Sequence, residues 1–308
     1  MKRKIYVSVL ATLVVVGLLG GMLTGCGRQA NPPEPPAQDG GVFQIKGSDS
    51  EVNVVQALVE EFVKVNNVAE FAVTGGGSGA GIAALINGQT DIANSSRPLR
   101  AEEIAQAKAN AVNPVPVVFA LDGLAVIVHA NNAVENLTLA QVGQIFSGEI
   151  TNWKEVGGAD SPITLYGRQS NSGTYVFFRD RVLGKDYSQA KLNLPGNAQI
   201  VEAVRADESG IGYAAVGFVR EAAGLRALSL AENPGSPFVS PLDDEKVLGG
   251  QYPLTRPLYQ FLNGVPSGAL RQFIEFELSP AGQEIVAREG FLPVTPEYRQ
   301  QNDQHLKQ

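Results

Sequence analysis

From residue 42 onward, short apolar strands alternate with amphipathic helices, and this alternation restricts the fold more than any other feature. Residues 42–46 alternate like a strand, and Val54, Leu58 and Phe62 then follow at the spacing of one helical face. Further strands are expected at 71–73 and 91–93, and further helices at 82–86 and 101–110. Such an order predicts an α/β protein with a mostly parallel sheet covered on both faces.

A second α/β unit follows a break in the apolar pattern at residues 121–123. Its expected helices are 139–146, 175–183 and 202–206, and its expected strands are 163–166 and 210–214. The last third of the chain adds a strand at 254–258 and a helix at 268–289 that Pro280 interrupts. Two such units predict two lobes with a hinge: residues 42–121 plus 246–308 form lobe I, and residues 122–245 form lobe II.

The N-terminus has the pattern of a secretory signal, with basic residues at 2–4 and an apolar run over 5–23. Cys26 is the only cysteine and directly follows Leu-Thr-Gly, which resembles a bacterial lipobox whose thiol receives a lipid. An uncleaved membrane helix is the alternative. We expect a signal peptide at residues 1–25 and a lipid on Cys26 that holds the chain at the extracytoplasmic face of the cell membrane.

Residues 26–41 are rich in proline and hold no apolar side chain larger than alanine, so they are expected to form an extended spacer. The formal net charge of the chain is −7, and it would be about −10 without the basic residues of the signal. This charge disfavours nucleic acid as a partner. A small anion remains compatible with it, because local donors and dipoles govern a buried site.

Glycine and hydroxyl residues gather at four expected strand-to-helix junctions: 47–50, 75–81, 94–98 and 167–174. Ligands of such sheets bind at these junctions, where glycines and helix N-termini present backbone N–H groups to anions. The second junction is not a Walker A loop, because Lys-Ser/Thr does not follow its glycines. The side chains and glycines expected to surround an anion are Ser48, Asp49, Ser50, Ser78, Gly79, Ser96, Arg97, Arg168, Ser172, Gly173 and Thr174.

Each junction also has an ordinary structural interpretation when taken alone. A glycine-rich turn or a helix cap explains most of the hydroxyl residues. Asp49 is either an anion contact or a cap, and Arg97 is either an anion contact or half of an ion pair. Together, the four junctions indicate a pocket of neutral donors with one or two guanidinium groups, which suits a tetrahedral oxyanion.

These junctions, in this order, resemble the PstS family of phosphate-binding proteins. Further matching segments are 91–98, 121–125, 146–153, 210–213 and 278–282. The resemblance implies a type II periplasmic-binding-protein fold whose two lobes close over inorganic phosphate. It also implies high-affinity capture and delivery to an ABC importer built from permease subunits and an ATPase. Carried over by position, Ser78, Arg168, Ser172, Gly173 and Thr174 match family phosphate contacts, and residues 48–50 match the first binding loop.

Two positions depart from the pattern of some family members. Where Ser96 stands, those members have an aspartate that accepts the proton of phosphate, and where Ser170 stands they have one that pairs with the arginine. Sulfate has no proton at neutral pH, so a buried carboxylate repels sulfate and accepts a hydrogen bond from phosphate. Asp49 is the candidate replacement in this chain.

Other functions fit the sequence less well. A binding protein for sulfate, molybdate or tungstate would share the expected fold, and only the family motifs favour phosphate over these anions. An adhesion or signalling protein that kept the fold would be expected to lack the pocket donors, which are present in this sequence. A phosphate-ester hydrolase would need a base, yet His129 and His305 are the only histidines, and neither a G-x-S-x-G elbow nor a His/Cys metal motif is present. We therefore expect no catalytic residue, no metal and no cofactor.

Overall fold

The structure is a computed structural model that describes residues 41–66 and 69–307. The expected signal peptide, the lipid site at Cys26 and all of the spacer except Gly41 lie outside the described residues. Within the described ranges, no helix combines the length and the hydrophobicity that crossing a bilayer requires.

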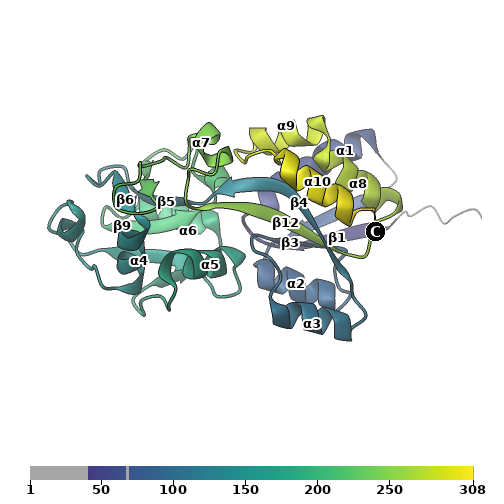
Figure 1. The fold of residues 1–308 in the computed structure, drawn as a ribbon, viewed down its shortest axis with the longest axis horizontal. Helices are drawn as coiled ribbons and strands as arrows, with labels where there is room; N and C mark the ends of the chain where they lie inside the picture. Colours follow the sequence, from purple (N-terminus) through teal and green to yellow (C-terminus); the bar gives the residue numbers. More distant parts are fainter. Residues whose placement is uncertain (1–40, 67–68, 308) are drawn as a thin grey trace, which may run out of the picture. The chain divides into compact units, whose positions relative to one another are not determined.

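The first sheet has the strand order β2-β1-β3-β12-β4. Its strands are β1 (Val42–Gly47), β2 (Glu70–Thr74), β3 (Ile92–Ser95), β4 (Pro114–Gly123) and β12 (Thr255–Asn263). In Figure 1, one face is covered by α1 (Val52–Val65), α8 (Gly268–Leu278), α9 (Pro280–Arg288) and α10 (Pro296–His305), and the other by α2 (Ser78–Ile86) and α3 (Ala101–Ala109). Separate apolar clusters fill the two interfaces.

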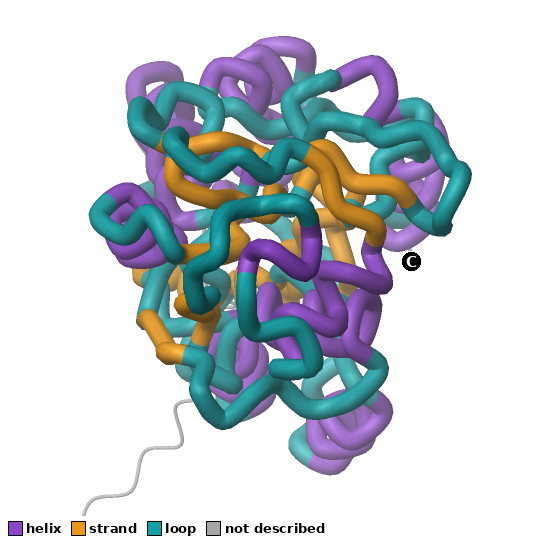
Figure 2. The backbone as a smooth tube through the Cα atoms, turned by 90° about the vertical axis from the view of Figure 1, so that its left-hand side faces the viewer, coloured by secondary structure: helices purple, strands orange, loops and turns teal. Residues whose placement is uncertain are grey.

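The second sheet has the order β10-β5-β9-β7-β8. Its strands are β5 (Ala125–His129), β7 (Thr164–Arg168), β8 (Leu192–Leu194), β9 (Gly210–Ala214) and β10 (Leu225–Ala227). Helix α6 (Asn197–Arg205) packs on one face, and α4 (Leu139–Ser147) and α5 (Gly173–Phe178) contribute to the core on the other. Figure 2 views the structure from the side of this second sheet, with helices in purple, strands in orange and loops in teal.

Smaller elements complete the fold. Strands β6 (Asn136–Thr138) and β11 (Ser229–Ala231) pair as a small parallel sheet of their own. Helix α7 is Asp244–Leu248, and further single turns of helix cover Trp153–Val156, Arg179–Leu183 and Val216–Phe218.

The expected α/β class and two-sheet arrangement are confirmed, but each sheet is parallel in only one half. Strands β2, β1 and β3 are parallel, as are β8, β7 and β9. Strand β12 enters the first sheet antiparallel between β3 and β4, and β5 pairs antiparallel with both β9 and β10. The antiparallel pairs arise where the chain leaves one sheet for the other and later returns.

Local sequence explains where the helices begin and end. The α1 face carries Val54, Leu58 and Phe62, all buried, and the Phe62 ring lies 5.5 Å from the ring of Phe273 on α8. The expected interruption near residue 280 separates α8 from α9. There Ser279 Oγ accepts the N–H of Gly282 at 3.2 Å, and Pro280 is the first residue of α9.

Candidate functional site

Five hydroxyl groups from both sheet regions meet in one buried cluster, called here the hydroxyl cluster: Ser48, Ser50, Ser78, Ser96 and Thr174. Each is at most 2% exposed. Ser96 Oγ lies 3.0 Å from Ser48 Oγ and 3.4 Å from both Ser78 Oγ and Thr174 Oγ1. Thr174 Oγ1 is in turn 3.1 Å from Ser50 Oγ. The structure therefore unites residues from all four junctions.

Strand direction explains this convergence. Parallel strands β1, β2 and β3 end at one edge of the first sheet, and the junctions with Ser48, Ser78 and Ser96 follow those ends. Thr174 lies in α5, which follows the end of β7 in the second sheet. The Ser48 N–H donates to Asn94 O at 2.9 Å, which fixes the first junction on the end of β3. The site thus lies where ligands bind in such sheets.

Glycines allow the junctions of the two sheet regions to touch. A Cβ on Gly173 would fall on the Oγ of Ser78 and lie 2.9 Å from both Ser78 Cβ and Ser96 Oγ. Gly77 has a φ of 91°, and a Cβ there would meet Asn171 O at 2.8 Å. The Gly79 N–H donates to the same Asn171 oxygen at 2.9 Å, so Gly79 joins the two loops through its backbone.

Arg168 is the last residue of β7 and is 1% exposed. Its Nη2 donates to Asp49 Oδ2 at 2.5 Å and to Pro195 O at 2.8 Å. Nε and Nη1 are buried and have no hydrogen-bond partner within the described ranges. Burial lowers the pKa of Arg168, and the Asp49 carboxylate opposes that shift. Two buried donor nitrogens without partners on a cation suit an oxyanion.

Asp49 joins the guanidinium to the glycine-rich junction. One carboxylate oxygen accepts the N–H of Gly76 at 2.9 Å, and the other accepts from Arg168. The residue in the N-cap position of α1 is Glu51, which makes no side-chain cap bond. Asp49 therefore connects two binding loops, and its hydrogen bonds in the structure are not those of a cap on α1.

The remaining candidates lie around the cluster with other partners. Arg97 donates to both carboxylate oxygens of Glu103, at 2.8 and 2.6 Å, which is the ion pair that the sequence left open as an alternative. Ser172 is buried at the N-terminus of α5, where its Oγ accepts the N–H of Tyr175 at 3.3 Å. In the described part of the chain, neither side chain is hydrogen-bonded to the hydroxyl cluster.

A buried ion pair beside the cluster was not predicted from the sequence. Arg256 on β12 donates to Asp122 on β4 at 2.9 and 2.7 Å, and its Nη1 donates to Ser96 O at 3.3 Å. The second oxygen of Asp122 accepts the N–H of Val216 at 2.9 Å. The available signal was an aspartate inside a long apolar run, because such a charge needs a buried partner.

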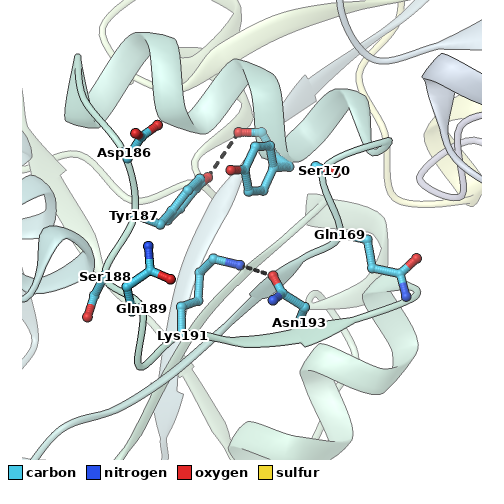
Figure 3. A pocket seen from close by; sticks show the side chains of 9 residues that line it. Gln169, Ser170, Asp186, Tyr187, Ser188, Gln189, Lys191 and Asn193 are labelled. Atoms are coloured by element: carbon cyan, nitrogen blue, oxygen red, sulfur yellow. Dashed lines mark hydrogen bonds between the residues drawn. The ribbon is translucent and has the colours of Figure 1, made fainter.

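A polar pocket of about 380 Å³ lies behind the Arg168 junction (Figure 3). In it Lys191 donates to Arg168 O at 3.2 Å and to Asn193 Oδ1. The Lys191 ammonium also lies 5.3 and 4.8 Å from the ring centres of Tyr175 and Tyr187. Burial lowers the pKa of Lys191 to about 8. These contacts hold the end of β7, and therefore Arg168, in place.

The histidines and possible metal ligands lie elsewhere. His129 ends β5 and accepts the N–H of Asn131 at 3.1 Å, while the His305 ring in α10 is 3.0 Å from Pro116 O. Over residues 41–66 and 69–307, no three histidine, cysteine or acidic side chains are grouped to hold a metal ion.

Comparison with known proteins gives one consistent result. Residues 32–281 match the PBP superfamily domain. The chain is 31% identical to the phosphate-binding protein PstS of Pseudomonas aeruginosa over 80% of this chain and 81% of that protein. It is also 31% identical to PstS of Bacillus subtilis, over 83% and 81% of the two chains.

A solved structure shares both sequence and fold with this chain. It is a crystal structure, with bound phosphate, of a Clostridium perfringens protein assigned to phosphate ABC transport as the substrate-binding component. The match has a TM-score of 0.73 and 32% identity, and it covers 82% of this chain and 100% of the other.

Proposed function

This chain belongs to the PstS family of phosphate-binding proteins, and from that premise we propose that it captures inorganic phosphate outside the cytoplasm for an ABC importer. The observation that carries the proposal is the convergence of the hydroxyl cluster beside a buried guanidinium with two unpaired donor nitrogens. Each hydrogen bond between such donors and a charged oxygen contributes ~1.5–3 kcal/mol.

Lobe closure is the proposed mechanism of capture. Lobe I comprises residues 42–121 plus 246–308, and lobe II comprises residues 122–245. An anion that bonds Ser78 in one lobe and Arg168 and Thr174 in the other has higher affinity for the closed state and shifts the population toward it. The closed form then docks on the permease subunits, and ATP hydrolysis by the separate ATPase reopens it.

A lipid on Cys26 is proposed to hold the protein on the membrane, with residues 26–41 as a spacer. The support is the lipobox-like sequence that ends at this single cysteine. A Cys26→Ser variant should leave the membrane fraction and appear in the soluble extracytoplasmic fraction. Equal membrane retention of both proteins would contradict lipid attachment at this position.

Isothermal titration with phosphate, sulfate and molybdate tests the proposed function. One phosphate per chain is expected, with weaker binding of the other two anions. The names of the relatives and the phosphate-bound neighbour favour phosphate over these alternatives. If sulfate or molybdate binds more tightly than phosphate, that anion and not phosphate is the ligand of this protein.

Asp49 is proposed to supply the selectivity that an aspartate at position 96 gives in other members. The ion pair with Arg168 holds the Asp49 carboxylate at the site. There it can accept a hydrogen bond from the proton of hydrogen phosphate, and its negative charge repels sulfate. Asp49→Asn should narrow the preference for phosphate over sulfate by about tenfold, the scale of one hydrogen bond to a charged group.

Titration of the variant with both anions measures this ratio. Asp303→Asn, a change at an exposed position in α10, is the matched control and should leave the ratio unchanged. If Asp49→Asn also leaves it unchanged, the residue is only the partner of Arg168.

A further inference from the structure

A buried set of polar side chains lies behind the hydroxyl cluster: Glu51, Asn94, Gln260 and Glu277. All four are 0% exposed, and none of their side-chain oxygen or nitrogen atoms has a hydrogen-bond partner in the part of the chain that the structure describes. Asn94 on β3 and Gln260 on β12 are direct cross-strand neighbours. Unpaired buried polar groups are costly, and a buried unpaired carboxylate is the most costly of them.

The surroundings of Glu51 favour its neutral form. Burial raises the pKa of Glu51 well above the ordinary carboxyl value, and the Ser48 hydroxyl and the charge of Arg256 only partly oppose this. Asp122 already pairs with Arg256, and the negative charge of Asp122 raises the pKa of Glu51 further. Burial also raises the pKa of Glu277, and the nearby Glu51 raises it further.

The hydroxyl cluster shows why the proton on Glu51 matters. Ser50 Oγ accepts from Asn197 Nδ2 at 3.2 Å, and Ser78 Oγ accepts the Ser96 N–H at 3.1 Å. A hydroxyl has one proton and two lone pairs. Each of these two serines therefore receives a hydrogen bond from a fixed donor and keeps its own proton to donate within the cluster.

Ser48 is the hydroxyl whose direction depends on a titratable neighbour. Within the described residues no hydrogen bond joins the side chains of Ser48 and Glu51, and Ser48 Oγ lies 3.0 Å from Ser96 Oγ. The Ser48 hydroxyl and the backbone N–H of Ser95 are nevertheless close enough to Glu51 to lower the pKa of that carboxyl. An ionised Glu51 would take the Ser48 proton as a hydrogen bond and turn the serine lone pairs toward an anion. A neutral Glu51 can donate to Ser48 Oγ and leave the Ser48 proton free.

We propose that Glu51 is held as a neutral carboxylic acid and that, in the phosphate-bound state, it donates a hydrogen bond to Ser48 Oγ, and so makes Ser48 a donor to the bound oxyanion. Glu51 is then a positioning residue, because it acts on the anion through Ser48. The inference rests on the proposed function, since it concerns the same site.

The charges around the site lead to the same conclusion. Arg168 pairs with Asp49 and Arg256 pairs with Asp122, so these two arginines already have acidic partners. An ionised Glu51 would add negative charge behind an anion site. The charged groups that act on Glu51 are Arg256 from β12 and Asp122 from β4, and Glu51 in turn acts on the titratable Glu277 from α8. Ionisation of Glu51 at high pH is therefore expected to weaken anion binding.

Two variants separate donation from simple packing. Glu51→Gln keeps an N–H donor and cannot ionise, so its phosphate affinity should stay within about threefold of the wild type. Glu51→Leu fills a similar volume without a donor and should bind phosphate about tenfold more weakly or worse. If Glu51→Gln loses as much affinity as Glu51→Leu, Glu51 is not a donor to Ser48.

Infrared spectroscopy of the full chain tests the proton directly and does not depend on phosphate binding. At neutral pH the wild type should show the carbonyl band of a protonated carboxyl group, and Glu51→Gln should remove part of it. Glu277→Gln is the matched control and should leave the Glu51 component in place. Absence of a Glu51-dependent band would overturn the proposal.

The pH dependence supplies a third readout. Phosphate itself titrates, but this contribution cancels in the ratio of wild-type to Glu51→Gln affinities. That ratio should fall once the pH passes the folded pKa of Glu51, and it should never rise with pH. A rise would contradict the proposal. If the wild type does not bind phosphate at all, the proposed function fails, whereas the infrared band still reports on Glu51.

Discussion

Replacement of Arg168 by alanine is expected to weaken phosphate binding by ~2–5 kcal/mol, the scale of removing one partner from a buried charge pair. The side chain is 1% exposed and keeps Nε and Nη1 without partners in the described residues, so the variant removes two donor nitrogens and the principal positive charge of the site. It also leaves the Asp49 carboxylate without its cation. Isothermal titration with phosphate measures the loss.

Two further arginine variants test whether the loss of affinity is specific to the guanidinium of Arg168. Arg168→Lys keeps the charge but loses the planar fork of N–H groups, so its affinity should lie between those of the wild type and the alanine variant. Arg226→Ala removes an arginine that pairs with Glu135 in another part of the fold and should leave affinity unchanged. Near-normal affinity of Arg168→Ala would remove this residue from the site.

Gly173→Ala is expected to reduce phosphate affinity by about 3 kcal/mol, the upper range for an overpacked contact. The added Cβ would fall on Ser78 Oγ and lie 2.9 Å from Ser78 Cβ, so it cannot be accommodated by a hydroxyl rotation alone. Ser78 and Gly173 belong to different proposed lobes. The clash therefore opposes closure of the two lobes. Each lobe can still fold, because alanine is well tolerated at the N-terminus of a helix such as α5.

Titration and thermal unfolding together test this expectation. Without phosphate, Gly173→Ala should unfold close to the wild-type temperature, and added phosphate should stabilise it much less than the wild type. Gly41→Ala is the control, because a Cβ at that position meets nothing within 4 Å. Wild-type affinity in Gly173→Ala would show that Ser78 and Gly173 do not approach each other in the bound state.

Elements with strong periodicity were predictable from the sequence. Helix α1 buries Val54, Leu58 and Phe62 on one face, as the apolar spacing predicts, and β9 covers the expected residues 210–214. Helix α2 begins at Ser78, four residues earlier than its apolar pattern suggests, because the small residues of the glycine-rich junction already take helical conformation. The short strands β8, β10 and β11 and the polar helix α10 were missed, since tertiary pairing and packing specify them.

The sequence predicted which junctions form the site, but not which ion pairs join their charged side chains. Placement at the ends of β1, β2, β3 and β7 brought Ser48, Ser78, Ser96 and Thr174 together as expected. The partner of each charge depends on distances that one sequence does not provide. Arg97 therefore could not be assigned to Glu103, nor Asp122 to Arg256, before the structure.

In this chain, which has serine at position 170, Asp49 is the acidic partner of Arg168. Here the carboxylate comes from the first junction and also accepts the Gly76 N–H, so the pair links the two proposed lobes. The ion pair can therefore help to hold the closed state as well as orient the guanidinium.

A crystal structure of the protein grown with phosphate tests most directly whether these groups share one ligand. One tetrahedral anion should lie between the two sheets, within hydrogen-bond distance of Arg168 and of hydroxyls from the 48–50, 78 and 174 positions. An anion bound elsewhere, with Arg168 and Ser78 on separate surfaces that face no common ligand, would contradict the proposed site.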